Sequence, residues 1–331
     1  EQIKMKISCF ISQLCMPRGP RPIYQRCQRS QTPARALAVQ CRAQLTATEH
    51  EARRYTFSSP SSEFPLPTSI YIHVPFCIQR CYYCDFAITA VGNQPDNPKL
   101  QSRYDTYVEH LLQEMELTLN GVRDRSSHAG KWPPLKTLYF GGGTPSLLPI
   151  PYYEKIFEFL KRNFEFAPDI EITMEMDPGT FGTAEAKNFK QLGMTRVSVG
   201  VQSFNDDLLK QCGRYHSVRD VYAAVDSLRE AGIYDIGLDL ISGLPNQTLE
   251  LWTQSLKCLI DLKPMHASTY DLEVHPSTKF GKMYKPGSFP LPDEGLAADM
   301  YETSIHMLNA AGILHYETSN FAVPGKESEH N

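Results

Sequence analysis

The feature that most restricts the fold of this chain is a regular alternation of short strand-like segments with longer helix-like segments. The strand-like segments are rich in β-branched and aromatic residues, and the segments between them repeat apolar residues at helical spacing. Gly193 and Gly232 end two of the predicted helices, as glycine commonly does. The predicted strands span residues 69–74, 135–140, 170–176, 196–201, 236–241 and 266–272, and the predicted helices span residues 104–117, 152–164, 184–192, 218–231 and 249–262. Strands joined by helices in this way predict an α/β fold built on a parallel sheet.

The alternation stops after residue 273. Residues 278–292 are rich in Pro, Gly and Lys, a helix is predicted over residues 297–308, and one strand is predicted over residues 313–322. A polar loop, residues 325–331, ends the chain. We therefore expect a core over residues 69–275 and, over residues 276–331, the start of a C-terminal α+β region that is cut short.

The N-terminal segment has a different composition from the rest of the chain. Residues 2–48 contain no Asp or Glu, but they contain eight Lys and Arg residues among Ser, Thr, Gln and Ala. This composition is typical of an organellar transit peptide, for plastid or mitochondrion, and residues 49–68 have the Pro- and Ser-rich composition of a linker. The alternatives are a disordered basic tail, or sequence upstream of a start at Met5 or Met16, and in those cases a cytoplasmic location is expected.

Composition limits the class of protein. The 331 residues are 41% hydrophobic and 21% charged with a net charge of −4, which suits a soluble protein with a sizeable core and gives no reason to expect a nucleic-acid partner. No apolar run reaches the length of a transmembrane segment. The nine Cys are not arranged as in a small disulfide-rich domain, so we expect free thiols in a reducing compartment.

Three of these cysteines form a compact motif. Cys77, Cys81 and Cys84 follow the first predicted strand, which Pro75 ends. A short loop can direct three thiolates to one point, as in a cubane iron–sulfur cluster, and three ligands would leave one iron open to a small molecule. The alternative is structural zinc, which requires a fourth ligand, and the nearby His73 has no evident inward orientation.

Polar residues gather where the predicted strands end. Parallel α/β barrels carry their chemistry at the carboxyl ends of the strands. The candidates there are the Cys loop after the first strand, Gly141–Pro145 after the second, Glu175 in the third, Gln202 at the end of the fourth, and Asp239 with Ile241 in the fifth. The glycine run either makes a tight turn or lets backbone N–H groups approach a bound carboxylate or amine.

Three charged residues are candidates for binding a ligand. Glu175 suits a ligand ammonium group, Arg214 suits a carboxylate through its two-pronged guanidinium group, and Asp239 suits ribose hydroxyls. Each has the alternative of an internal ion pair or a surface position. Gln202 has the alternative of a core amide bonded to the backbone.

Together these motifs resemble a known family. The Cys77/Cys81/Cys84 loop is similar to the radical S-adenosylmethionine (SAM) signature. The surrounding motifs resemble those of the oxygen-independent coproporphyrinogen III oxidase family, in the same order over residues 69–331. They are Tyr71–Cys77, Gly141–Pro145, Gly200–Phe204, Gly213–Arg214 and Asp239–Pro245.

The resemblance implies a partial (β/α)6 radical SAM barrel. It also implies a [4Fe-4S] cluster on the three thiolates, with the amine and carboxylate of SAM on the open iron and an electron donor such as ferredoxin or flavodoxin. The residues that the resemblance places around SAM are Tyr71, Tyr83, Gly142, Gly143, Thr144, Glu175, Gln202, Arg214, Asp239 and Ile241.

One position separates two branches of that family. The decarboxylase branch carries a further Cys two residues after the third, and this chain has Phe86 there. The motif instead resembles the haem-chaperone branch, which binds haem as cargo and passes it to haem-accepting proteins. That branch has a C-terminal motif implicated in haem binding, which begins with the pair found here as His330 and Asn331. The resemblance makes His330 a candidate haem ligand, although at the end of this chain we expect it to be frayed.

Overall fold

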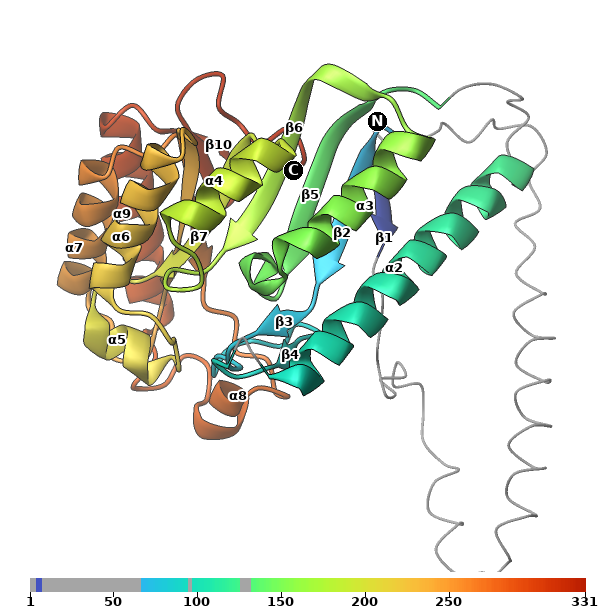
Figure 1. The fold of residues 1–331 in the computed structure, drawn as a ribbon. Helices are drawn as coiled ribbons and strands as arrows, with labels where there is room; N and C mark the ends of the chain where they lie inside the picture. The colour runs from blue at the N-terminus through green and yellow to red at the C-terminus, as the bar shows by residue number, and fades with distance from the viewer. Residues whose placement is uncertain (1–3, 8–66, 95–96, 126–131) are drawn as a thin grey trace, which may run out of the picture. The chain divides into compact units, whose positions relative to one another are not determined.

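The computed structural model describes residues 4–7, 67–94, 97–125 and 132–331 (Figure 1). Most of the predicted transit segment and linker lies outside these residues. The strands are β1 (Lys4–Ile7), β2 (Ser69–Val74), β3 (Phe76–Cys77), β4 (Thr89–Ala90), β5 (Leu135–Gly142), β6 (Phe166–Met176), β7 (Arg196–Gln202), β8 (Asp235–Ser242), β9 (His266–Asp271), β10 (Leu314–Glu317) and β11 (Asn320–Ala322). The helices are α2 (Pro98–Arg125), the 3-10 helix η1 (Pro145–Leu147), α3 (Ile150–Asn163), α4 (Thr183–Leu192), α5 (Asp206–Gln211), α6 (Val218–Glu230), α7 (Leu249–Asp261), α8 (Lys279–Met283) and α9 (Glu294–Ala310).

The main sheet has the order β1-β2-β5-β6-β7-β8-β9-β11-β10. Neighbouring strands from β1 to β9 are parallel, and β11 and β10 continue the sheet in antiparallel pairings. The six strands predicted between residues 69 and 272 are therefore confirmed, as is their parallel arrangement. Among the described strands the sheet is not closed, because β1 and β10 form its two edges.

One predicted strand was wrong. Residues 313–322 form a hairpin, with a turn at Thr318 and Ser319, instead of a single strand. The turn lacks the Asn-Gly or Gly-rich pair that usually marks a two-residue hairpin, so the pattern gave no sign of it. The hairpin pairs with β9 through β11, which places residues 314–322 in the main sheet. The domain boundary predicted at residue 276 stays a prediction.

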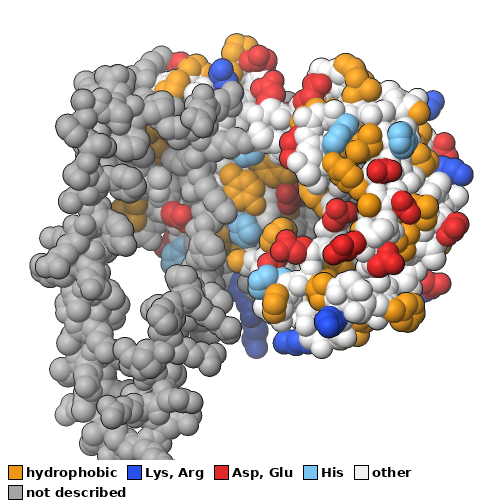
Figure 2. Space-filling model, turned by 180° about the vertical axis from the view of Figure 1, so that it is seen from behind, with side chains coloured by type: hydrophobic (Ala, Val, Ile, Leu, Met, Phe, Trp, Pro, Cys, Tyr) orange, Lys and Arg blue, Asp and Glu red, His pale blue; other side chains and the backbone are white. Residues whose placement is uncertain are grey.

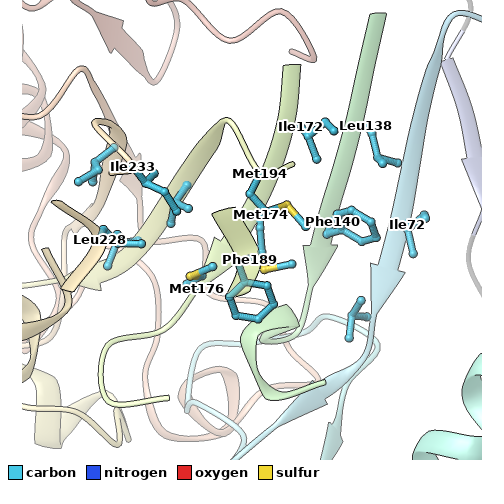
Figure 3. Packing of buried hydrophobic residues seen from close by; sticks show 14 of the residues in the cluster. Ile72, Leu138, Phe140, Ile172, Met174, Met176, Phe189, Met194, Leu228 and Ile233 are labelled. Atoms are coloured by element: carbon cyan, nitrogen blue, oxygen red, sulfur yellow. The ribbon is translucent and has the colours of Figure 1, made fainter. Parts of the chain in front are cut away.

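Helices lie along the outer face of the sheet, where the strands carry apolar side chains. Figure 3 shows Ile72, Phe140 and Met174 of three neighbouring strands on this face, with Phe189 of α4 close to Met174. All four residues are at most 1% exposed. Because side chains alternate along a strand, the residues between them face inward. Those inward residues are largely polar, and they form the site described below.

The ends of the helices follow local sequence signals. The α6 helix begins where the backbone N–H of Ser217 donates to Asp220 Oδ2 at 2.8 Å, and α9 begins where Asp293 Oδ1 accepts from the N–H of Leu296 at 2.9 Å. Gly193 and Gly232 follow α4 and α6 with φ values of 110° and 80°, a conformation that favours glycine. The predicted stop signals are thus confirmed.

None of the described helices combines the length and apolar character needed to span a membrane. On the face shown in Figure 2, acidic side chains are scattered among apolar and uncharged ones. This mixed surface agrees with the small negative net charge of the whole chain.

Candidate functional site

The Cys loop runs between β3 and β4, which pair as a separate small sheet. Arg80 holds the loop from within: its guanidinium group donates to the carbonyl oxygens of Cys84, Phe86 and Ile88 at 3.0 to 3.2 Å. Gln79 Nε2 anchors the loop to the main body through the carbonyl oxygen of Gly213 at 2.8 Å. The Cys spacing predicted the loop but not these two anchors, whose sequence signal is only their position between the cysteines.

The pKa values of two of the loop thiols, Cys77 and Cys84, are raised above that of an ordinary cysteine. Burial, together with the nearby Asp177 and the other two loop thiols, raises the pKa of the Cys77 thiol to about 12, although the hydrogen bond from Thr144 lowers it. Burial also raises the pKa of Cys84. Cys77, Cys81 and Cys84 are free thiols. Metal binding must therefore displace protons from Cys77 and Cys84 at neutral pH, which a multivalent iron centre can do.

The geometry does not favour the zinc alternative. Among the residues that the structure describes, no three His, Cys, Asp or Glu side chains converge closely enough to hold a single ion. Both ring nitrogens of His73 have other neighbours, since Nε2 lies 2.9 Å from the carbonyl oxygen of Ala87 and Nδ1 lies 3.4 Å from Tyr71 Oη. Three thiols on one cavity wall provide the three protein ligands expected for a cubane cluster with one open iron.

A cavity of about 510 Å³ lies between the Cys loop and the inner face of the sheet. This volume is typical of a site for a cofactor-sized molecule. Most of the residues predicted for the site line it: Cys77, Cys81, Tyr83, Cys84, Gly142, Gly143, Glu175, Gln202, Arg214, Asp239 and Ile241. The structure thus brings together side chains from the Cys loop and from four strands. Tyr71, Thr144 and His330 do not line the cavity, but they contact residues that do.

Two half-buried carboxyl groups face this cavity. Burial raises the pKa of Glu175 to about 7, although the N–H of Gly142 and the hydroxyl of Tyr139 donate to its two oxygens at 3.0 and 2.9 Å. Burial likewise raises the pKa of Asp239 to about 6, although Ser198 Oγ lies 2.9 Å from Asp239 Oδ2. Carboxylates held in a low-dielectric cavity attract a positively charged ligand.

Arg214 lines the cavity and is also paired within the protein. Its Nη2 pairs with Asp177 and donates to the carbonyl oxygen of Gly200 at 2.9 Å, and its Nη1 lies 3.4 Å from Cys81 Sγ and 3.5 Å from Tyr83 Oη. The guanidinium group is therefore held by an internal ion pair, which was the alternative for this residue. Only Nε has no partner among the described atoms. Arg214 thus places one positive charge beside the loop thiols.

Sequence reasoning missed Asp177. This carboxylate pairs with Arg214 and accepts a hydrogen bond from Thr144 Oγ1 at 3.0 Å, and the same Thr144 hydroxyl lies 3.6 Å from Cys77 Sγ. Asp177 therefore links two residues that flank two of the loop thiols. The available signal was its position two residues after Glu175, where β6 has just ended.

The structure corrects the expected state of His330. The side chain is not frayed, because only 7% of the residue is exposed and its Nδ1 lies 2.8 Å from Thr137 Oγ1. Its ring also packs near Tyr71 and Tyr139.

Gln202 differs from the alternative of a core amide bonded to the backbone. It ends β7 with a φ of 66° and lines the cavity.

Gly143 lies where two backbone segments approach closely. A Cβ atom added there would stand 2.7 Å from the carbonyl oxygen of Phe76 and 2.8 Å from the carbonyl carbon of Pro75. Because these atoms are backbone, we expect Gly143→Ala to displace the start of the Cys loop and to destabilise the protein by about 1–3 kcal/mol. Urea unfolding of the two proteins measures this loss. Gly232→Ala is the comparison. Gly232 has a φ of 80° but a Cβ there would meet no atom within 4 Å, so this variant measures backbone strain without a clash.

These features define a class of protein. The chain belongs to the radical SAM superfamily, whose family model matches residues 71–259, from β2 into α7. Membership implies an iron–sulfur cluster and SAM as cofactors, and it confirms the predicted α/β radical SAM fold. Over 266 residues the chain is 42% identical to a Synechocystis protein named heme chaperone HemW, an alignment that covers 80% of this chain and 62% of the relative.

Other relatives agree with this assignment. The Escherichia coli heme chaperone HemW is 37% identical, over 80% of this chain and 65% of its own length. A Danio rerio protein named radical S-adenosyl methionine domain-containing protein 1, mitochondrial, is 32% identical, over 80% of this chain and 56% of its own length. The chain therefore spans less than two thirds of the length of these relatives.

A solved structure shares the fold. Coproporphyrinogen III oxidase (HemN) from Escherichia coli, described as a radical SAM enzyme, matches with a TM-score of 0.68 and 27% identity. The match covers 81% of this chain and 58% of that one. The resemblance inferred from the sequence motifs is thus confirmed at the level of the family.

Proposed function

We propose that the three loop thiolates hold a [4Fe-4S] cluster and that the cavity beside them holds SAM. The observation that carries this proposal is that Cys77, Cys81 and Cys84 line one cavity together with the half-buried carboxylates Glu175 and Asp239. Glu175 suits the ammonium group of SAM, and Asp239 suits its ribose hydroxyls. When bound, the cluster supplies an electron for reductive cleavage of SAM.

The remaining predicted residues complete this site. Gly142 and Gly143 present backbone to the ligand, and Tyr83 and Ile241 give the cavity an apolar wall beside Gln202. Thr144 and Arg214 act through the loop thiols, since each lies within 3.6 Å of one of their sulfur atoms. Tyr71 does not line the cavity, but its ring stacks on Tyr139, which does, and so supports the position of that ring.

At the level of the whole protein, we propose a haem chaperone that carries this cluster. The support is the 42% identity to a protein of that name, together with Phe86 at the position where the decarboxylase branch has a further Cys. Phe86 is 64% exposed at the rim of the cavity, so its presence there is not required by core packing. Haem would be cargo, to be passed to haem-accepting proteins, and a ferredoxin or flavodoxin would supply the electron.

The test uses anaerobically reconstituted protein. We expect an S = 1/2 EPR signal after dithionite reduction, a shift of that signal on addition of SAM, and haem that stays with the protein through gel filtration. Coproporphyrinogen III incubated with SAM and reductant should remain unconverted. Turnover of coproporphyrinogen would instead support the oxidase that the HemN structure resembles, and an unchanged EPR signal with SAM would contradict the proposed cofactor site.

An organellar location is part of this proposal. Its support is the acid-free basic composition of residues 2–48 and a relative whose name places it in mitochondria. A fluorescent protein fused after residue 68 should collect in plastids or mitochondria, whereas a fusion that begins at residue 49 should stay in the cytosol. A cytosolic signal from both fusions would overturn it.

A further inference from the structure

The last residues of the chain cross the inner face of the sheet. After β11, Lys326 Nζ pairs with Asp235 of β8 at 3.1 Å, and the Lys326 carbonyl oxygen accepts a hydrogen bond from Arg196 of β7 at 3.0 Å. Farther along, the N–H of Glu329 donates to Glu171 of β6 at 3.3 Å. These contacts follow one another from strand to strand, so they hold the segment along its length.

This path brings His330 onto β5, the next strand. His330 Nδ1 lies 2.8 Å from Oγ1 of Thr137, which is 1% exposed. The imidazole centroid lies 5.0 Å from that of the Tyr139 ring and 6.3 Å from that of the Tyr71 ring. The two tyrosines stack on each other with centroids 5.7 Å apart. Three packed rings restrict the orientation of each member, including Tyr139.

Tyr139 connects this ring cluster to the cavity. Its hydroxyl donates to Glu175 Oε1 at 2.9 Å, while the N–H of Gly142 donates to Oε2 of the same carboxylate. Both donors come from β5, as does Thr137. One strand therefore carries the contact to His330 and both hydrogen bonds that orient Glu175.

We propose that His330 is a positioning residue for the SAM site: it fixes the ring of Tyr139, and Tyr139 fixes the carboxylate of Glu175. The proposal rests on the proposed binding of SAM by Glu175. It assigns His330 a role different from that of a haem ligand, because the imidazole is buried against Thr137 and the two tyrosines.

The test is a double-mutant cycle on reconstituted protein, with SAM affinity measured by equilibrium dialysis. We expect His330→Ala and Tyr139→Phe each to weaken SAM binding about tenfold, the typical value of one hydrogen bond to a charged group. The double variant should be no more than about twofold weaker than either single variant, because both changes disturb the same contact. His330→Phe keeps an aromatic ring against the tyrosines, so it should retain most of the affinity, and it serves if His330→Ala does not fold.

The other readouts separate the possible explanations. Iron content and haem retention should be unchanged in the His330 variants, and His306→Ala, an exposed histidine on α9, should match the wild type throughout. Wild-type protein that fails to bind SAM would refute the proposed function itself. Wild-type binding of SAM with unchanged affinity in His330→Ala, or additive effects in the cycle, would refute only the positioning role. Loss of haem with SAM affinity intact would also refute it, and would make His330 a haem ligand.

Discussion

Cys81→Ser should leave the protein without its cluster. A [4Fe-4S] cluster on this loop has only three protein ligands, so Cys81→Ser removes one of the three thiolates that hold it. We expect the iron content after anaerobic reconstitution to fall from about four per chain to less than about one, with loss of the broad iron–sulfur absorption. Iron and sulfide analysis with visible spectroscopy measures the change.

A second cysteine provides the control. Cys258→Ser alters a free, partly buried thiol on α7, away from the cavity, and should retain the wild-type iron content. The folded state of both variants can be compared by far-ultraviolet circular dichroism. If Cys81→Ser still holds about four irons per chain, the loop does not carry the cluster.

The parts of this molecule that could be predicted are those specified by local sequence. The six parallel strands, their helices and the glycine stop signals depend on hydrophobic spacing and turn chemistry within about twenty residues. The Cys loop is equally local, since its three ligands lie within eight consecutive positions. The positions of Glu175 and Asp239 near the ends of two predicted strands also predicted that they would face one site, because neighbouring parallel strands end at the same edge of a sheet.

The parts that could not be predicted depend on contacts between distant segments. The ion pair between Arg214 and Asp177 is one example, because the two residues lie 37 positions apart in the sequence. Similarly, the path of residues 325–331 depends on charges from three strands, and no periodicity in a short polar loop reveals them. For that reason a histidine at the end of the chain was taken as frayed although it is buried.

Glu175→Gln should nearly abolish SAM binding. The substitution keeps the size of the side chain and an oxygen that can accept from Gly142, but it removes the charge that would pair with the ligand ammonium. The loss of one partner of a buried ion pair commonly costs about 2–5 kcal/mol, so we expect affinity to fall by at least about thirtyfold. Isothermal titration with SAM measures this, and iron content should stay at the wild-type level. Glu158→Gln, on the exposed face of α3, is the matched control.

The pH dependence distinguishes a lost charge from a general disturbance. Because burial raises the pKa of Glu175 to about 7, wild-type affinity for SAM should rise between pH 6 and pH 8 as the carboxylate ionises. Stability of the ligand-free protein should change in the opposite direction. A carboxyl group whose pKa is raised in the folded state stabilises that state below its ordinary pKa, near 4.5, and the contribution disappears as the pH rises through about 7.

In Glu175→Gln the rise in affinity near pH 7 should disappear. A smaller rise near pH 6 should remain, because Asp239 still ionises there and faces the same cavity. Asp177, Tyr71 and Tyr139 also surround Glu175, but neither tyrosine ionises in this range, since burial raises the pKa of each above its ordinary value. An unchanged profile near pH 7 in the variant would show that another group controls binding. In that case Glu175 would not be the residue that receives the positive charge of SAM.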